Sequence, residues 1–267
     1  MHQRTDREIC EEPSAAPLLD AIPRQGRTGR AAAPPPPPVR RACRGLRPLP
    51  TPTRTPFTFG YLLVLVATSL FMEYADPATV AAVLRESSTD VAHLGEAPLL
   101  VLAASALWVV GGLASPMVFV LALVLNALER RIGGWRTAAV FVLGHVVATL
   151  ATEIPVGLSV VAGHLPESSL HRLDYGISFG LMASVGALAG LFAPLLRVLL
   201  LGGTGVMLAL DLVELSNPLA DWGHPMALLL GVACWPLLRR AGAVRGAAPS
   251  RRAPRGTRPP ARVPGPR

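Results

Sequence analysis

Two polar residues inside apolar stretches are the side chains in this sequence best suited to chemistry. Ser178 lies in the stretch Gly-Ile-Ser-Phe-Gly at 176–180, and His224 lies in Gly-His-Pro-Met-Ala at 223–227. A serine hydroxyl beside a neutral imidazole becomes a nucleophile because the imidazole takes the hydroxyl proton. Polar side chains are costly inside a membrane helix and often mark function there. Ser178 and His224 are therefore candidates for a nucleophile and its base.

The spacing of nearby acidic residues predicts that the two candidates lie at the same depth. Asp174 precedes Ser178 by four positions, and Asp221 precedes His224 by three. Each acid stands just before an apolar run. If both runs begin at the same membrane face, a helical rise of about 1.5 Å per residue places both side chains roughly 5 Å below it. Spacing alone does not say whether they face each other.

The composition indicates an all-α polytopic membrane protein. Hydrophobic residues make up 51% of the 267 positions, charged residues 16%, and mean hydropathy is +0.44. Several apolar runs approach the roughly 17 to 25 residues that a helix needs to cross a bilayer. Ser115-Pro116 interrupts the second run and predicts a kink or an early start there. We expect six transmembrane helices, at 57–74, 97–128, 136–154, 175–193, 198–215 and 222–238.

The charge distribution predicts the domain organisation. Residues 1–56 carry ten Arg and 12 of the 27 Pro, and residues 239–267 carry nine Arg and no acid. Such segments cannot bury enough apolar surface to fold. We therefore expect a disordered Pro/Arg-rich tail over 1–56, a membrane domain over 57–238 and a disordered basic tail over 239–267. No basic–aromatic module accompanies these charges, which argues against nucleic acid as a partner.

The loop charges predict the orientation in the membrane. Arginines between the second and third spans, between the fourth and fifth, and after the sixth favour the cytoplasm, together with both termini. The other loops are mostly acidic and belong outside. The chain contains Arg but no Lys, and Ala, Gly and Pro are abundant. This composition is typical of a high-GC bacterial genome. We expect a multi-pass protein of the bacterial plasma (inner) membrane. Cys and His spacing suggests no metal or cofactor.

Small residues predict how the two motif helices pack. Ala227 and Gly231 share the helical face of His224, while Gly176, Gly180 and Ala183 lie on the side of the fourth span away from Ser178. Small residues let helices approach closely in lipid, so the fourth span should be central. An alternative role for Ser178 and His224 is interhelical hydrogen bonding without chemistry.

His145 is the next polar residue of interest. It lies in the middle of the third span, and Glu153 follows it by about two turns. A structural hydrogen bond is one role for His145, and donation of a hydrogen bond to a reaction intermediate is another. Both roles stay open from the sequence.

With these motifs in place, residues 57–238 resemble the rhomboid family of intramembrane serine proteases. Glu129-Arg130…Gly133 is similar to the family's Glu-Arg turn at the cytoplasmic end of the second helix. Gly176-x-Ser178, with Ala183 and Gly186 beyond it, resembles the nucleophile motif. His224-x-x-Ala227-x-x-x-Gly231 resembles the sixth helix.

The resemblance implies a six-helix rhomboid-like bundle and a Ser-His dyad. Ser178 would attack a peptide carbonyl and His224 would take its proton, while the Ser178 backbone N–H, supported by Gly176 and His145, would hold the oxyanion. Helix packing would fall to Gly180, Ala183, Gly186, Ala227 and Gly231. The substrate would be a transmembrane protein cut near the outer membrane face.

The sequence also departs from the family pattern. Phe179 replaces the usual Gly after the nucleophile, and Met182 replaces an aromatic residue. Leu113 and Met117 occupy the positions of a His-x-x-x-Asn pair. The tryptophan-arginine motif is missing from the first external loop. Two hypotheses follow: an intramembrane serine endopeptidase, or a catalytically inactive rhomboid-like protein that binds membrane-protein clients.

Overall fold

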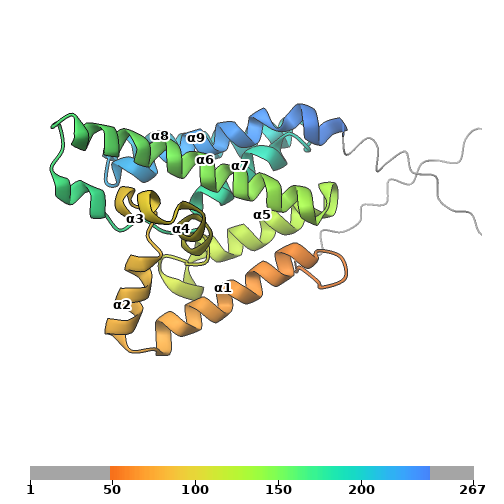
Figure 1. The fold of residues 1–267 in the computed structure, drawn as a ribbon. Coiled ribbons are helices and arrows are strands. Elements are labelled where there is room, and N and C mark those ends of the chain that lie inside the picture. The colour runs from red at the N-terminus through yellow and green to blue at the C-terminus, as the bar shows by residue number, and fades with distance from the viewer. Residues whose placement is uncertain (1–48, 241–267) are drawn as a thin grey trace, which may run out of the picture. The chain divides into compact units, whose positions relative to one another are not determined.

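The computed structural model describes residues 49–240, which belong to a compact unit over Leu46–Arg267. The tails predicted at 1–56 and 239–267 fall almost entirely outside the described residues. Every regular element within 49–240 is helical, as expected for the all-α class. Figure 1 shows the chain entering and leaving this unit at the same end.

Nine α-helices and two short 3₁₀ helices make up this described part of the chain. In chain order they are α1 (Pro56–Tyr74), α2 (Pro77–Glu86), α3 (Val91–Glu96), α4 (Pro98–Ser105), η1 (Gly112–Ala114), α5 (Pro116–Ile132), α6 (Gly134–Val161), η2 (Glu167–His171), α7 (Ser178–Ala189), α8 (Pro194–Glu214) and α9 (Pro218–Ala233).

Three of the described helices are long and apolar enough to cross a membrane: α1, α6 and α8. Helices α5, α7 and α9 have 17, 12 and 16 residues. Since a crossing takes about 20 residues, the helix lengths alone support three spans. The six-span topology therefore stays a prediction.

The second predicted span, at 97–128, is not a continuous helix. It consists of α4, an irregular stretch that includes the short 3₁₀ helix η1, and α5. Helix α4 ends at Ser105, and Gly111 and Gly112 adopt positive φ values of 81° and 66° in the irregular stretch before the expected kink at Ser115-Pro116. Side chains of α1 satisfy the freed carbonyls: the Tyr61 hydroxyl donates to Ala106 O at 2.6 Å. The apolar composition of the run concealed this break.

Glu129, which is 2% exposed, links the end of α5 to the start of α1. Its carboxylate accepts hydrogen bonds from the backbone N–H groups of Phe57 and Thr58, at 3.0 and 2.7 Å, and from the Thr58 hydroxyl at 2.7 Å. These are the orphan N–H groups at the start of α1. The end of α5 and the start of α1 are thus held together at one end of the unit.

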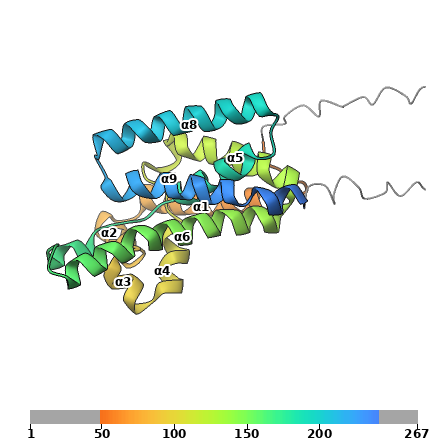
Figure 2. The same ribbon diagram turned by 90° about the horizontal axis from the view of Figure 1, so that it is seen from above.

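Helix α7 is the central helix, and this confirms the expectation from its small residues. All residues from Phe179 to Ala189 are buried. Helix α8 is the opposite case, because Leu208 is its only buried residue. Figure 2 shows α8 along one edge of the described unit, with α9 beside it. Because α7 is covered by protein, it need not match the thickness of the bilayer.

Candidate active site

Helices α7 and α9 pack in parallel through glycines that face backbone. A side chain at Gly186 would collide with the carbonyl of Leu228, and one at Gly231 would collide with the carbonyl of Ala183. At the start of α7, the Phe179 ring fills the space beside Gly223. Beyond the ends of both helices, the Trp235 ring fills the space beside Gly190. Both helices therefore run in the same direction, and the first turn of α7 lies at the level of the second turn of α9.

This packing brings Ser178 and His224 to the same level of the unit. Ser178 is the first residue of α7, directly before Phe179. The Phe179 ring meets the imidazole of His224 edge-on, with centroids 5.4 Å apart and an interplanar angle of 73°. One aromatic side chain is thus the immediate neighbour of both candidates.

No hydrogen bond within the described residues joins Ser178 to His224. A dyad would place the two side chains within reach of a direct or water-mediated hydrogen bond, and the direct bond is absent here. The Nε2 atom of His224 is buried without a partner. The Ser178 hydroxyl has no hydrogen bond among residues 49–240 either. Ser184, on the same helix, behaves as a structural serine should, because its hydroxyl donates to Gly180 O at 2.7 Å. Neither candidate therefore acts as an interhelical hydrogen-bonding group here.

Ser178 lines a small cavity of about 10 Å³. This volume approaches the room that one water molecule needs. Most of its walls are polar, so such a water would find hydrogen-bonding partners. The lining residues are Thr89, His145, Thr149, Asp174, Tyr175, Gly176, Ser178 and Phe179. The structure thus places Ser178 and His145 around one cavity, as their proposed shared role requires.

His145 is held by the last turn of α4. Its Nε2 atom lies 3.1 Å from Leu102 O and 3.0 Å from Ser105 Oγ. Since a carbonyl can only accept, Nε2 carries the proton in this arrangement and Nδ1 is left as an acceptor. Nδ1 is buried without a partner. His145 therefore has a structural bond on one nitrogen and an unused acceptor on the other.

Glu153 does not pair with His145. Both of its carboxylate oxygens are buried without hydrogen-bonding partners, and the residue is 1% exposed. Thr149 lies between the two on the same side of α6, and its hydroxyl also lacks a partner. Sequence reasoning missed Thr149. Its spacing of four residues from both His145 and Glu153, which aligns the three on one helical face, was the available signal.

Comparison with family models identifies the chain. The model described as rhomboid-like protein matches residues 53–244, which is most of the sequence. The chain belongs to this rhomboid-like family. Comparison with curated proteins and with solved structures finds no match to either. The match spans every described helix, so the helical unit as a whole is the rhomboid-like domain.

The packing residues expected from the rhomboid resemblance lie in tight helix contacts. Ala227 is fully buried and Ala183 is 1% exposed. A side chain at Gly180 would collide with the Phe141 ring of α6. Together with the contacts of Gly186 and Gly231, these residues bind the central helix to α6 and α9. Met182, at the position of an expected aromatic residue, is buried in the same core.

Two segments remote in sequence form the rim of the cavity. Thr89 N donates to Asp174 O at 2.8 Å, and the Thr89 hydroxyl donates to the Asp174 carboxylate at 3.0 Å. Burial, with the nearby Asp90 charge, raises the pKa of Asp174, although Thr89 and Arg172 oppose this shift. The loop between α2 and α3 of this rhomboid-like chain, which lacks the tryptophan-arginine motif, is thus tied by Thr89 to the segment before α7.

The start of α7 offers hydrogen-bond donors beside Ser178. The first helical bond of α7 runs from Leu181 N to Ile177 O at 3.0 Å, so the N–H groups of 178–180 precede it. Gly176 has a φ of 138°, which suits glycine, and its N–H donates to Ser105 O at 3.0 Å. The positive end of a helix with free N–H groups favours a developing negative charge.

Proposed function

We propose that this rhomboid-like protein is an intramembrane serine endopeptidase in which Ser178 is the nucleophile and His224 the base. The observation that carries the proposal is that both polar groups lie at one level of two tightly packed parallel helices without a hydrogen bond of their own. A buried imidazole nitrogen without a partner costs free energy. A catalytic role explains why such a group is present. Catalytic hydrogen bonds are often loose before substrate binds.

The groups around Ser178 support an acyl-transfer reaction. The hydroxyl would attack a peptide carbonyl while Nε2 of His224 accepts its proton. The N–H groups at the start of α7 would hold the resulting oxyanion, with Gly176 shaping the approach. His145 lines the same cavity, and its unused Nδ1 acceptor would position a water there, although in this tautomer it has no proton to donate to the oxyanion. No cofactor enters this scheme.

The substrates we propose are transmembrane segments of other proteins, cut near the outer face of a bacterial plasma membrane. The arginines at the ends of α5 and α9 and at the starts of α6 and α8 support a cytoplasmic location for that end of the unit. Ser178 begins α7 and His224 lies in the second turn of α9, both toward the other end. Six spans with both termini in the cytoplasm satisfy this distribution.

Labelling with a fluorophosphonate tests the dyad. The full-length protein in detergent should be labelled, and Ser178→Ala should abolish labelling and cleavage of a single-span test substrate. His224→Ala should reduce both to background, and the double variant should be no worse than either single one, because members of a catalytic unit are non-additive. Ser184→Ala is the matched control and should stay active. Unchanged cleavage in Ser178→Ala would refute the proposal.

A second candidate function is favoured by Phe179. Its ring lies against His224 and Gly223, the side of the imidazole on which an approach to Ser178 would be expected. A protein that binds client membrane segments without cutting them has no need of a free dyad. This hypothesis predicts an unlabelled wild-type protein and labelling that appears in Phe179→Gly. The protease hypothesis predicts labelling of the wild type.

A further inference from the structure

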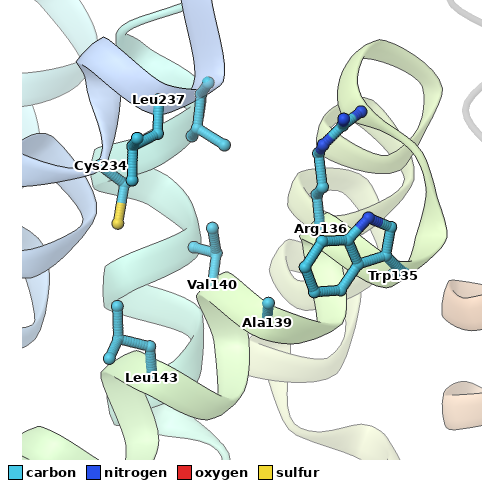
Figure 3. Close-up of a pocket in the computed structure, with 8 residues that line it drawn as sticks. Trp135, Arg136, Ala139, Val140, Leu143, Cys234 and Leu237 are labelled. Atoms are coloured by element: carbon cyan, nitrogen blue, oxygen red, sulfur yellow. The ribbon is translucent and has the colours of Figure 1, made fainter. Parts of the chain in front are cut away.

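A groove at the arginine-rich end of the unit is separate from the candidate active site. It has a volume of about 240 Å³ and lies between the first turns of α6 and the helical segment at 235–240 that follows α9. Its walls are Trp135, Arg136, Ala139, Val140, Leu143, Cys234, Leu237 and Leu238. Figure 3 shows Trp135 and Arg136 together on α6, with Cys234 and Leu237 on the opposite side. All but one of the lining residues are uncharged.

We propose that this groove binds one anionic phospholipid, with its phosphate at Arg136 and an acyl chain along the apolar walls. Trp135 is 75% exposed and Leu237 69% exposed, so large apolar surfaces flank the cation. Trp side chains favour the boundary between headgroups and hydrocarbon, which is where a lipid phosphate lies. The single cation matches the negative phosphate of an anionic lipid, and the apolar walls match its acyl chain.

Arg136 differs from three other arginines at this end, Arg131, Arg197 and Arg239, in what it contacts. Arg131 lies over the Phe192 ring, and Arg197 and Arg239 lie over the Trp235 ring. The last two also donate to carbonyls at the end of α7. Arg136 has no ring contact or ion pair among the described residues, and one Nη1 bond to Ile132 O at 3.3 Å. Its guanidinium keeps donors for a phosphate.

The position of Arg136 in α6 adds to the attraction. It lies in the first turn of a 28-residue helix, where the helix dipole favours negative charge. Arg130 and Arg131 end α5 a few residues earlier. The headgroup would therefore meet a positive potential from several sides, while the hydrocarbon below it meets Ala139, Val140 and Leu143. A zwitterionic headgroup would gain less from the same site.

Native mass spectrometry of the full-length protein with phosphatidylglycerol or phosphatidylcholine tests the proposal. High ionic strength should screen the many arginines of the two tails, which all variants share. We expect the wild type to retain phosphatidylglycerol in preference to phosphatidylcholine. Arg136→Gln should weaken its retention about fivefold, the equivalent of about 1 kcal/mol for one cation at a membrane surface. Arg85→Gln, an exposed arginine on α2, should leave it unchanged.

Filling the groove tests the apolar half of the site. Ala139→Trp should remove the bound lipid while keeping Arg136, and Ala103→Trp on the exposed side of α4 is the matched control. Equal retention of the two lipids by wild type would overturn the proposal. Unchanged phosphatidylglycerol binding in both Arg136→Gln and Ala139→Trp would also overturn it. These results do not depend on whether the dyad is active.

Discussion

At the residue scale, Phe179 controls the surroundings of both candidate catalytic residues. It follows Ser178 directly, and its ring lies edge-on to His224 at 5.4 Å. Edge-to-face ring pairs contribute about 0.5–1.5 kcal/mol beyond the area they bury. The ring also fills the space that Gly223 leaves open. Phe179, where the rhomboid pattern has a glycine, thus contacts His224 and directly follows Ser178 in the chain.

Asp174 predicts a pH dependence of stability. Burial raises its pKa in the folded protein, so the ionised form is disfavoured there relative to the unfolded chain. Its contribution to stability is therefore greatest in acid and is lost as pH rises through the folded pKa. Asp174→Asn keeps an oxygen that accepts from Thr89 and removes the charge. The variant should be at least as stable as wild type at pH 7–8.

Thermal melting in detergent between pH 4 and pH 8 measures this effect. The difference between wild type and Asp174→Asn should grow in favour of the variant as pH rises. Asp76→Asn is a control from an exposed helix cap. A difference in melting temperature that shrinks with rising pH would contradict the raised pKa of Asp174.

At the element scale, the contact between α7 and α9 predicts a sharp contrast between glycines. Gly186→Ala would drive a methyl group into the Leu228 carbonyl, so the helices must separate. Overpacking of this kind costs about 1–3 kcal/mol. Gly203→Ala on α8 meets nothing within 4 Å and should leave the melting temperature unchanged or slightly higher. Equal melting temperatures for both variants would show that α7 and α9 pack less closely than described.

The link from α5 to α1 gives a second prediction at this scale. Glu129→Ala leaves the buried N–H of Thr58 without its acceptor, and each such group costs about 1–3 kcal/mol. The variant should lose thermal stability, and proteolysis should cut first near residue 56. Arg130→Ala, the adjacent position, is the control and should behave like wild type. Resistance of the chain near residue 56 to proteolysis in Glu129→Ala would contradict the role of Glu129 in capping α1.

The sequence predicted some of these elements well, and the reasons differ by residue. The small residues predicted that α7 is central, because glycine and alanine along an apolar run let neighbouring helices approach closely. The break between α4 and α5 was hidden, since the apolar residues around Gly111 and Gly112 look alike in a helix or a loop. The Glu129 cap was missed because its partner lies 71 residues away in the sequence. The orientation of the Phe179 ring could not be predicted from the sequence, because it depends only on how the side chains pack.

At the scale of the whole molecule, the central position of α7 bears on the number of membrane crossings. Only α1, α6 and α8 have the length and composition of spans within the described residues. Helix α7 is buried on all sides, and the side chains of Arg197, Trp235 and Arg239 donate to carbonyls toward its C-terminal end. A short central helix can therefore complete a crossing together with the extended residues before it. Six crossings remain compatible with three long helices.

Cysteine accessibility tests the orientation that this arrangement implies. In a background without Cys10, Cys43 and Cys234, single cysteines replace the exposed residues Glu96, Glu167 and Arg240. A membrane-impermeant maleimide should label the first two in intact cells. It should label Arg240→Cys only after permeabilisation, because the arginines that end the chain favour the cytoplasm. Labelling of Arg240→Cys in intact cells would place Ser178 and His224 near the inner face, where the proposed cleavage site could not lie.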